Sequence, residues 1–127
     1  MIRTEQGEAR YQVGFSNGSH EGLADASLHK GGQGSGFGPH ELLEASLATC
    51  INMWIRMQGD KLGIPVRGVW VTVTLRRDLP GESVFEYALR MEGSMTPAQE
   101  AQLLGLAETC PVRQTLLKQI AFRRTEG

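Results

Sequence analysis

The chain has 127 residues, 40% of them hydrophobic, and this length predicts one domain over residues 1–127, large enough to own a core but too small to divide. Its formal net charge of −1 and mixed charge pattern give no excess of positive charge that would bind nucleic acid or an anionic membrane surface, so neither partner is expected. The N-terminal residues do not resemble a signal peptide, and no apolar run could cross a bilayer. We therefore expect a cytoplasmic protein.

The first expected element is a β-hairpin. Apolar residues alternate with polar or small ones over residues 9–15, and Asn17-Gly18 follows, a strong hairpin signal. The return strand is expected over roughly residues 19–28. A glycine-rich loop comes next, over residues 30–38, and such a loop before a helix can cradle a phosphate. It contains neither G-x-G-x-x-G nor a P-loop ending, so a mobile surface loop, or a backbone segment close to a partner subunit, is favoured.

Residues 38–63 predict one long helix with Cys50 near its middle. Pro39 suits the first helical position, Gly63 can adopt the left-handed capping conformation, and Pro65 prevents continuation. Apolar residues cover more of this helix than the single stripe of a surface helix, so it should be enclosed by protein on most sides. At about 1.5 Å per residue it would be roughly 36 Å long, more than the width of such a domain. We therefore expect a homodimer in which a second copy covers part of the helix.

Two further strands are expected after the helix. Valines and a leucine alternate with other residues over 69–76, the turn sequence DLPGES follows, and residues 84–91 alternate again. These patterns predict a second antiparallel hairpin. Hairpins on either side of a buried helix indicate an α+β fold with antiparallel sheets around a long central helix.

The C-terminal part is expected to be mainly helical. Residues 96–99 have the pattern of a capping box with proline at the first helical position, which predicts a helix over 97–109. Cys110-Pro111 then restarts the chain in a short helix ending near Gln119. Residues 120–124 could form an edge strand.

Cys50 and Cys110 are the only cysteines, and in a reducing compartment such a pair is either reactive or merely buried. A reactive cysteine needs a neighbour that lowers its pKa, because the thiolate is the nucleophile. Cys110 would sit at a helix N-terminus, where the helix dipole favours a negative sulfur. Cys50 would need a charged side chain from another element, so local sequence predicts Cys110 as the more acidic thiol. The alternative for both is a small buried apolar side chain.

The sequence gives little support for a metal site or for a cysteine–histidine hydrolase. The two cysteines and three histidines (His20, His29 and His40) form neither a C-x-x-C nor an H-x-x-x-H pair, so we expect no metal site and no cofactor. A cysteine–histidine hydrolase is conceivable, but no local signature supports it.

Two segments resemble motifs of the OsmC/Ohr family of thiol-dependent peroxidases. Residues 38–50, GPHELLEASLATC, resemble the Pro-x-x-Leu helix start that leads to the family's first cysteine, and residues 110–112 resemble the Cys-Pro-Val segment around its second. The order of expected elements is also similar over nearly the full length. The resemblance implies an OsmC-like intertwined homodimer with two active sites at the subunit interface.

The resemblance also implies roles for both cysteines. Cys50 is the peroxidatic cysteine, whose thiolate attacks an organic hydroperoxide, with inorganic peroxide as a further candidate, and becomes a sulfenic acid. Cys110 is the resolving cysteine, which forms a disulfide with Cys50 that an unidentified dithiol reductant reopens. Local sequence favoured Cys110 as the more acidic thiol, whereas the resemblance makes Cys50 the cysteine that attacks the peroxide.

The first turn of the long helix departs from the family pattern. In the family, an arginine stabilises the thiolate and a glutamate directly after the motif proline holds that arginine. Here His40 takes the glutamate's position and Glu41 follows it. On an ideal helix Glu41 lies opposite Cys50, whereas His40 is about 80° from Cys50 and faces a better direction. The family supplies the arginine from an N-terminal strand, where Arg10 is the first candidate and Arg3 the second.

Residues around the cysteines suggest further roles. Arg113, three residues after Cys110, could lower the pKa of Cys110. Met53, Trp54 and Met57 could line a cleft for substrate, although such residues are more often plain core. The rival hypothesis is a redox-inactive module that binds a small apolar ligand in the same cleft at the dimer interface. A third hypothesis is thiol–disulfide exchange with a protein partner.

Overall fold

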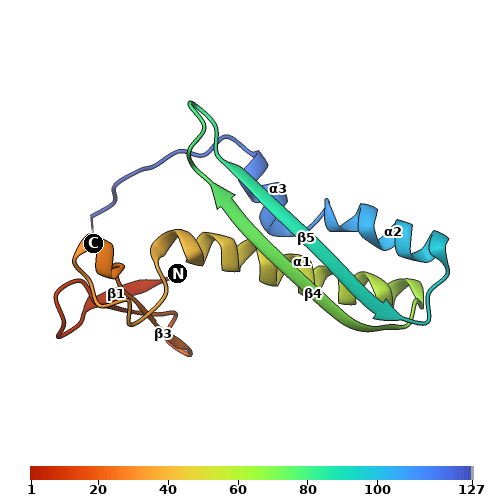
Figure 1. Cartoon of the computed structure of the whole chain (residues 1–127), viewed down its shortest axis with the longest axis horizontal. Coiled ribbons are helices and arrows are strands. Elements are labelled where there is room, and N and C mark those ends of the chain that lie inside the picture. The colour runs from red at the N-terminus through yellow and green to blue at the C-terminus, as the bar shows by residue number, and fades with distance from the viewer. Residues whose placement is uncertain (127) are drawn as a thin grey trace. The chain divides into compact units, whose positions relative to one another are not determined.

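The computed structural model describes residues 1–126 and contains two compact units, Met1–Leu43 and the remainder from Glu44 onward. The first unit holds a small sheet and the start of the long helix, and the second holds most of the long helix, a hairpin and two shorter helices (Figure 1). This is the expected α+β fold. The elements in chain order are β1 (Arg3–Gln6), β2 (Val13–Ser16), β3 (Glu21–Ala24), the 3-10 helix η1 (Leu28–Lys30), α1 (Pro39–Leu62), β4 (Val66–Arg76), β5 (Val84–Gly93), α2 (Pro97–Ala107) and α3 (Pro111–Leu117).

The first unit contains an antiparallel sheet in the order β1-β2-β3. The Asn17-Gly18 turn between β2 and β3 confirms the expected hairpin. Asn17 Oδ1 accepts the backbone N–H groups of Ser19 and His20 at 2.9 and 2.7 Å, and Gly18 has a φ of 95° that suits glycine. The strands are shorter than expected, since β2 starts at Val13 and β3 ends at Ala24.

Two features of this sheet differ from the expectation. Strand β1 was not predicted, because its residues RTEQ are all exposed and lack an apolar alternation. Residues 9–12, expected at the start of a strand, instead belong to the connection from β1 to β2, where the Gly7 N–H donates to the Gln12 carbonyl at 2.8 Å. Arg10 therefore lies in a turn and not on a strand.

The glycine-rich loop is tied to β3, which corrects the expectation of a mobile loop. The Phe37 N–H donates to the Leu23 carbonyl at 3.0 Å, and the Asp25 N–H donates to the Phe37 carbonyl at 3.0 Å. Asp25 adds a second attachment, because its Oδ2 accepts the Ser35 hydroxyl at 2.7 Å and the backbone N–H groups of Gln33 and Ser35 at 3.2 and 3.1 Å. A Cβ on Gly36 would collide with the Leu23 carbonyl oxygen, so this close approach requires glycine.

Asp25 should make the stability of this loop depend on pH. The Ser35 hydroxyl, followed by the Ser35 N–H, holds the pKa of Asp25 below its usual value, and burial opposes them. A carboxyl group whose pKa is lower in the folded state stabilises the fold above its unfolded pKa, and this contribution is lost as the pH falls through the folded value. In urea titrations, Asp25→Asn should therefore be less stable than wild type near neutral pH, and the difference should shrink below about pH 4.

Asp78→Asn is the matched control, since Asp78 is 69% exposed and pairs with Arg76 at the surface. Its unfolding midpoint should follow that of the wild type closely across the same pH range. Parallel wild-type and Asp25→Asn curves would contradict the loop-anchoring role of the Asp25 carboxylate.

Helix α1 has the ends that the sequence predicts. Pro39 is its first residue, and the Gly38 N–H donates to Glu41 Oε1 at 2.8 Å, as in one half of a capping box. At the other end Gly63 has a φ of 68°, and the Ile64 N–H donates to the Gly59 carbonyl at 2.9 Å. The chain can therefore turn directly from α1 into β4.

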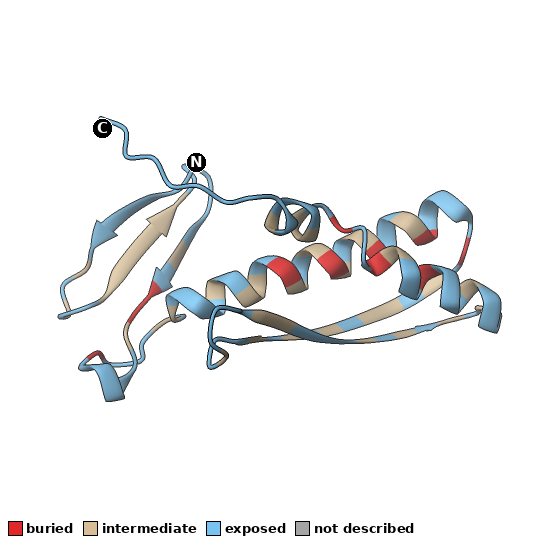
Figure 2. Ribbon diagram, turned by 90° about the horizontal axis from the view of Figure 1, so that it is seen from above, coloured by how far each residue is buried: buried red, intermediate tan, exposed pale blue. Residues whose placement is uncertain are grey.

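The β4–β5 hairpin follows α1 within the second unit (Figures 1 and 2). Two polar side chains of α1 hold the backbone of β4: Asn52 Nδ2 donates to the Val69 carbonyl at 2.9 Å, and Glu44 Oε2 accepts the Leu75 N–H at 2.8 Å. The long helix and the hairpin are thus fixed in register.

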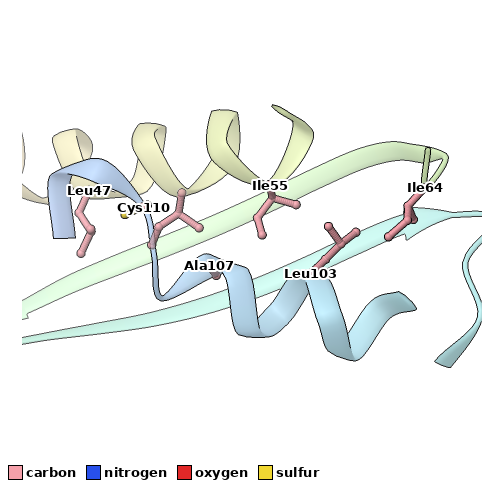
Figure 3. Packing of buried hydrophobic residues seen from close by; sticks show 7 residues of the cluster. Leu47, Ile55, Ile64, Leu103, Ala107 and Cys110 are labelled. Carbon is pink, nitrogen blue, oxygen red and sulfur yellow. The ribbon is translucent and has the colours of Figure 1, made fainter. Parts of the chain in front are cut away.

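One buried stripe of α1 contributes to the core (Figure 2). Its buried residues recur every four positions, which is the spacing of one helix face. Met53 and Met57 are 45% and 56% exposed, so within this unit α1 is enclosed on fewer sides than expected. The homodimer that would cover the remainder stays a prediction. The core cluster, shown in Figure 3, consists of Leu47, Ile51, Ile55, Ile64, Leu103, Ala107 and Cys110.

The C-terminal helices agree with the sequence, and the final strand does not. Thr96 and Gln99 form the predicted capping box of α2, and Pro111 starts α3. The expected edge strand at 120–124 is wrong, because these residues pair with no strand among the described residues. An alternating pattern becomes a strand only where a backbone partner is available. Across residues 1–126, no helix is both long and apolar enough to cross a membrane.

Candidate active site

The structure brings the two cysteines together. Cys50 lies on α1 and is half-buried, whereas Cys110 is the N-cap residue of α3 and has 0% exposure, within the core cluster (Figure 3). The Val112 N–H, in the first turn of α3, donates to Cys50 Sγ at 3.5 Å. Both thiols are free in this structure. Pro111 starts α3 at this point. The contact between Val112 and Cys50 places residues 110–112 against the middle of α1.

Burial determines the protonation of Cys110. Desolvation raises the pKa of the Cys110 thiol, and the Cys50 side chain raises it further. The backbone N–H of Arg113 and the charge of its guanidinium act in the opposite direction but do not offset burial. The expectation of an acidic Cys110 is therefore wrong, because a helix N-terminus stabilises a thiolate less than complete burial disfavours it.

The raised pKa of Cys110 should be visible in its alkylation. In a Cys50→Ser variant, the iodoacetamide reaction of Cys110 should be slow at neutral pH and should still accelerate at a pH where an ordinary thiol, with a pKa of about 8.5, has levelled off. Rates measured by mass spectrometry over a pH series test this, with the urea-unfolded variant as the control. A folded-state profile that levels off below the unfolded one would contradict it.

Arg113 is engaged with the backbone between α2 and α3. Its Nη1 donates to the Glu108 carbonyl at 2.6 Å, so the guanidinium helps to hold the turn before Cys110. Arg113 also borders an otherwise largely apolar hollow of about 290 Å³, lined among others by Ile51, Phe85 and Leu116. The residue thus favours the Cys110 thiolate by its charge, as expected, and also closes the α2–α3 turn.

The three residues expected to line a substrate cleft have different surroundings. Met53 borders a hollow of about 380 Å³ together with Thr49, Asn52 and Arg56. Trp54 packs against the core cluster, and its indole N–H is directed to the end of α2. Met57 is 56% exposed on the surface of the unit.

The remaining candidates belong to the first unit. Arg10 is exposed in the β1–β2 turn, with its guanidinium 5.1 Å from the centre of the Tyr11 ring. Arg3 lies on β1, and His40 is exposed at the second position of α1. Glu41 accepts the Gly38 N–H, so its carboxylate caps the helix.

The sequence patterns missed Thr109 and Val112. Thr109 Oγ1 accepts the Trp54 indole N–H at 3.0 Å, and the Val112 backbone N–H contacts Cys50 Sγ. A backbone donor has no residue signature, and a threonine before Cys-Pro is too common a combination to single out. Among residues 1–126, no group of three or more His, Cys, Asp or Glu side chains is arranged to hold a metal ion.

Comparison with known proteins points to one family. A family model described as "OsmC-like protein" matches residues 32–123, which include both cysteines. No curated protein matches the chain significantly.

Solved structures share the fold at low sequence identity. A Psychrobacter arcticus protein, named as an osmotic stress induced and detoxification response protein, is 21% identical with a TM-score of 0.75, and the match covers 90% of this chain and 85% of that one. An OsmC-like protein of Mycoplasma pneumoniae is 19% identical with a TM-score of 0.74, covering 91% and 85%. An organic hydroperoxide resistance protein, OsmC, of Legionella pneumophila is 22% identical with a TM-score of 0.64, covering 92% and 88%.

Proposed function

Because the chain belongs to the family of OsmC-like proteins, we propose that it is a cysteine-based peroxidase that reduces organic hydroperoxides, with Cys50 as the peroxidatic and Cys110 as the resolving residue. The observation that supports this most is the contact between the two thiol-bearing segments, in which the Val112 N–H reaches Cys50 Sγ. Several solved relatives are named as organic hydroperoxide resistance proteins. Inorganic peroxide is a secondary candidate substrate.

The first step is oxidation of Cys50. Its thiolate attacks one oxygen of the peroxide, an S–O bond forms, and the O–O bond breaks. The departing alkoxide takes up a proton and leaves as an alcohol, while Cys50 becomes a sulfenic acid. Cys50 is half-buried and accepts the Val112 N–H, so a donor is already directed at the sulfur that carries the negative charge.

The second step joins the cysteines. The Cys110 sulfur attacks the sulfenic sulfur, an S–S bond forms, and the hydroxyl group leaves as water with the thiol proton. The high pKa of Cys110 fits this order of events, because a protonated, fully buried thiol is protected from direct oxidation by peroxide. A dithiol reductant then returns both cysteines to thiols.

The same proposal assigns roles to further residues in the expected homodimer. We assign Arg10 to thiolate stabilisation and His40 to the position of the family glutamate, with Met53, Trp54 and Met57 beside the substrate. Glu41 is a weaker candidate because its carboxylate caps α1. Cytoplasmic location belongs to the same proposal, since the reaction needs a supply of reducing dithiol.

The proposal is tested by stoichiometry. Reduced protein mixed with cumene hydroperoxide should consume one equivalent of peroxide per chain and yield a Cys50–Cys110 disulfide, identified by peptide mass spectrometry. Hydrogen peroxide in a parallel reaction measures the preference for organic substrates. No loss of thiols, or equal loss in Cys50→Ser, would overturn the proposal.

Binding of a small apolar ligand is the second candidate function. The hollow of about 380 Å³ beside Met53 favours it, because an alanine, a valine and a methionine supply much of its lining. Ligand retained through purification, together with thiols that do not react with peroxide, would support this function.

Mixed disulfides trapped by a Cys110→Ser variant would instead indicate exchange with a protein partner.

A further inference from the structure

Trp54 links the long helix to the residues directly before Cys110. Its indole N–H donates to the Leu106 carbonyl at 3.1 Å and to Thr109 Oγ1 at 3.0 Å. The Thr109 hydroxyl donates in turn to the Leu106 carbonyl at 2.7 Å. These three groups form one small network at the C-terminal end of α2, where carbonyl groups lack partners within the helix.

The same face of α1 also carries Cys50. Residues four positions apart on a helix are neighbours, so Cys50 lies one turn before Trp54. Trp54 holds Thr109, the residue before Cys110, and Cys50 accepts the N–H of Val112, two residues after it. The segment that contains Cys110 is therefore attached to one face of α1 at two points, through Thr109 before the cysteine and through Val112 after it.

Packing alone does not require the indole N–H. Phenylalanine would supply an aromatic ring at the same position, but it could not donate to Leu106 or Thr109. A donor shared between the backbone of α2 and the Thr109 side chain restricts the α2–α3 turn more closely than apolar contact does. Because no residue lies between Thr109 and Cys110, this restriction is transmitted directly to the thiol.

We propose that Trp54 is a positioning residue that holds Cys110 beside Cys50 and so sets the effective concentration of the resolving thiol. The inference rests on the proposed function for its biological meaning, in which Cys110 displaces water from the Cys50 sulfenic acid. The positioning itself is a property of the thiol pair and can be measured without peroxide.

Equilibrium with glutathione measures this property directly. Oxidised glutathione converts the two thiols into the disulfide and releases two molecules of reduced glutathione, so the equilibrium constant reports the effective concentration of Cys110 at Cys50. In Trp54→Phe this constant should fall roughly three- to tenfold, the range expected for loss of one shared hydrogen-bond donor. Thr109→Val removes the Thr109 hydroxyl but keeps the hydrogen bond from the Trp54 indole N–H to the Leu106 carbonyl, so it should give a smaller fall. Trp70→Phe on β4 is the matched control and should not change the constant.

A kinetic readout separates positioning from a general structural role. In Trp54→Phe, disulfide formation should slow relative to the formation of Cys50 sulfenic acid with cumene hydroperoxide, so the sulfenic acid should persist longer and react more with dimedone. Equal glutathione constants for Trp54→Phe, Trp70→Phe and wild type would overturn the inference. An equal decrease in sulfenic acid formation and disulfide formation would overturn it too, because it indicates a disturbed fold.

Failure of the inference is distinguishable from failure of the proposed function. If the protein does not react with hydroperoxide, the glutathione equilibrium still tests positioning. If it does react and Trp54→Phe resembles the wild type, only the positioning role is rejected. Urea unfolding of each variant shows whether it is folded. If Trp54→Phe is unfolded, Thr109→Val provides the test of positioning.

Discussion

Replacement of Cys50 by serine should lower hydroperoxide consumption by at least about 1,000-fold, because loss of the attacking nucleophile removes the only route through a covalent intermediate. A serine hydroxyl has the same connectivity as the thiol, is somewhat smaller, and is not ionised at neutral pH. The rest of the site, including the first turn of α3 that donates to position 50, stays in place. Peroxide loss in a colorimetric assay measures the effect.

Cys110→Ser should behave differently and is the matched control. With Cys50 intact, it should consume one equivalent of peroxide and then stop, with the oxidised sulfur trapped by dimedone. Cys110 is fully buried, so serine introduces a polar group into the core and the variant should be somewhat less stable. Continued turnover by Cys50→Ser, or dimedone labelling of Cys110 in that variant, would contradict the assignment of the nucleophile.

The largest effect on stability is expected at Leu103. This residue has 0% exposure in the core cluster, so Leu103→Ala leaves a cavity and should cost about 2.7–5 kcal/mol of unfolding free energy. The adjacent Leu104 is 41% exposed, and Leu104→Ala should cost less than about 1 kcal/mol. Urea unfolding of the two variants, which differ only by one position along α2, measures the contrast.

The Leu103→Ala and Leu104→Ala variants also test whether the outer face of α2 is exposed to solvent in solution. If Leu104→Ala costs as much as Leu103→Ala, the outer face of α2 is buried by something that the single chain does not contain. If neither variant loses stability, the packing described for the core is wrong.

Local sequence predicted the ends of elements well. Pro39 and Gly63 bound α1, Asn17-Gly18 forms the hairpin turn, and Thr96 caps α2. Each signal acts within a few residues, through a fixed φ, a permitted positive φ or a side chain that reaches a neighbouring N–H. Such preferences need no tertiary context, which is why they can be read from the chain alone.

Prediction was weaker wherever an element depends on a distant partner. Strand β1 forms from polar residues because β2 offers its edge, and residues 120–124 stay irregular because no described strand pairs with them. The glycine-rich loop is held by Asp25, whose role depends on its approach to Ser35. None of these contacts has a local sequence signature.

The candidate site shows the same division. Sequence motifs identified Cys50 and Cys110, but local chemistry made Cys110 the acidic thiol, and burial in the tertiary structure raises its pKa instead. Desolvation depends on what packs around a group, so no local sequence rule contains it. The sequence by itself determined the ends of α1, the hairpin turn at Asn17-Gly18, the cap of α2 and which thiols are available. Only the tertiary structure decided that Cys110 is buried, and that Trp54 and Val112 hold its segment against α1, because these contacts join residues more than fifty positions apart.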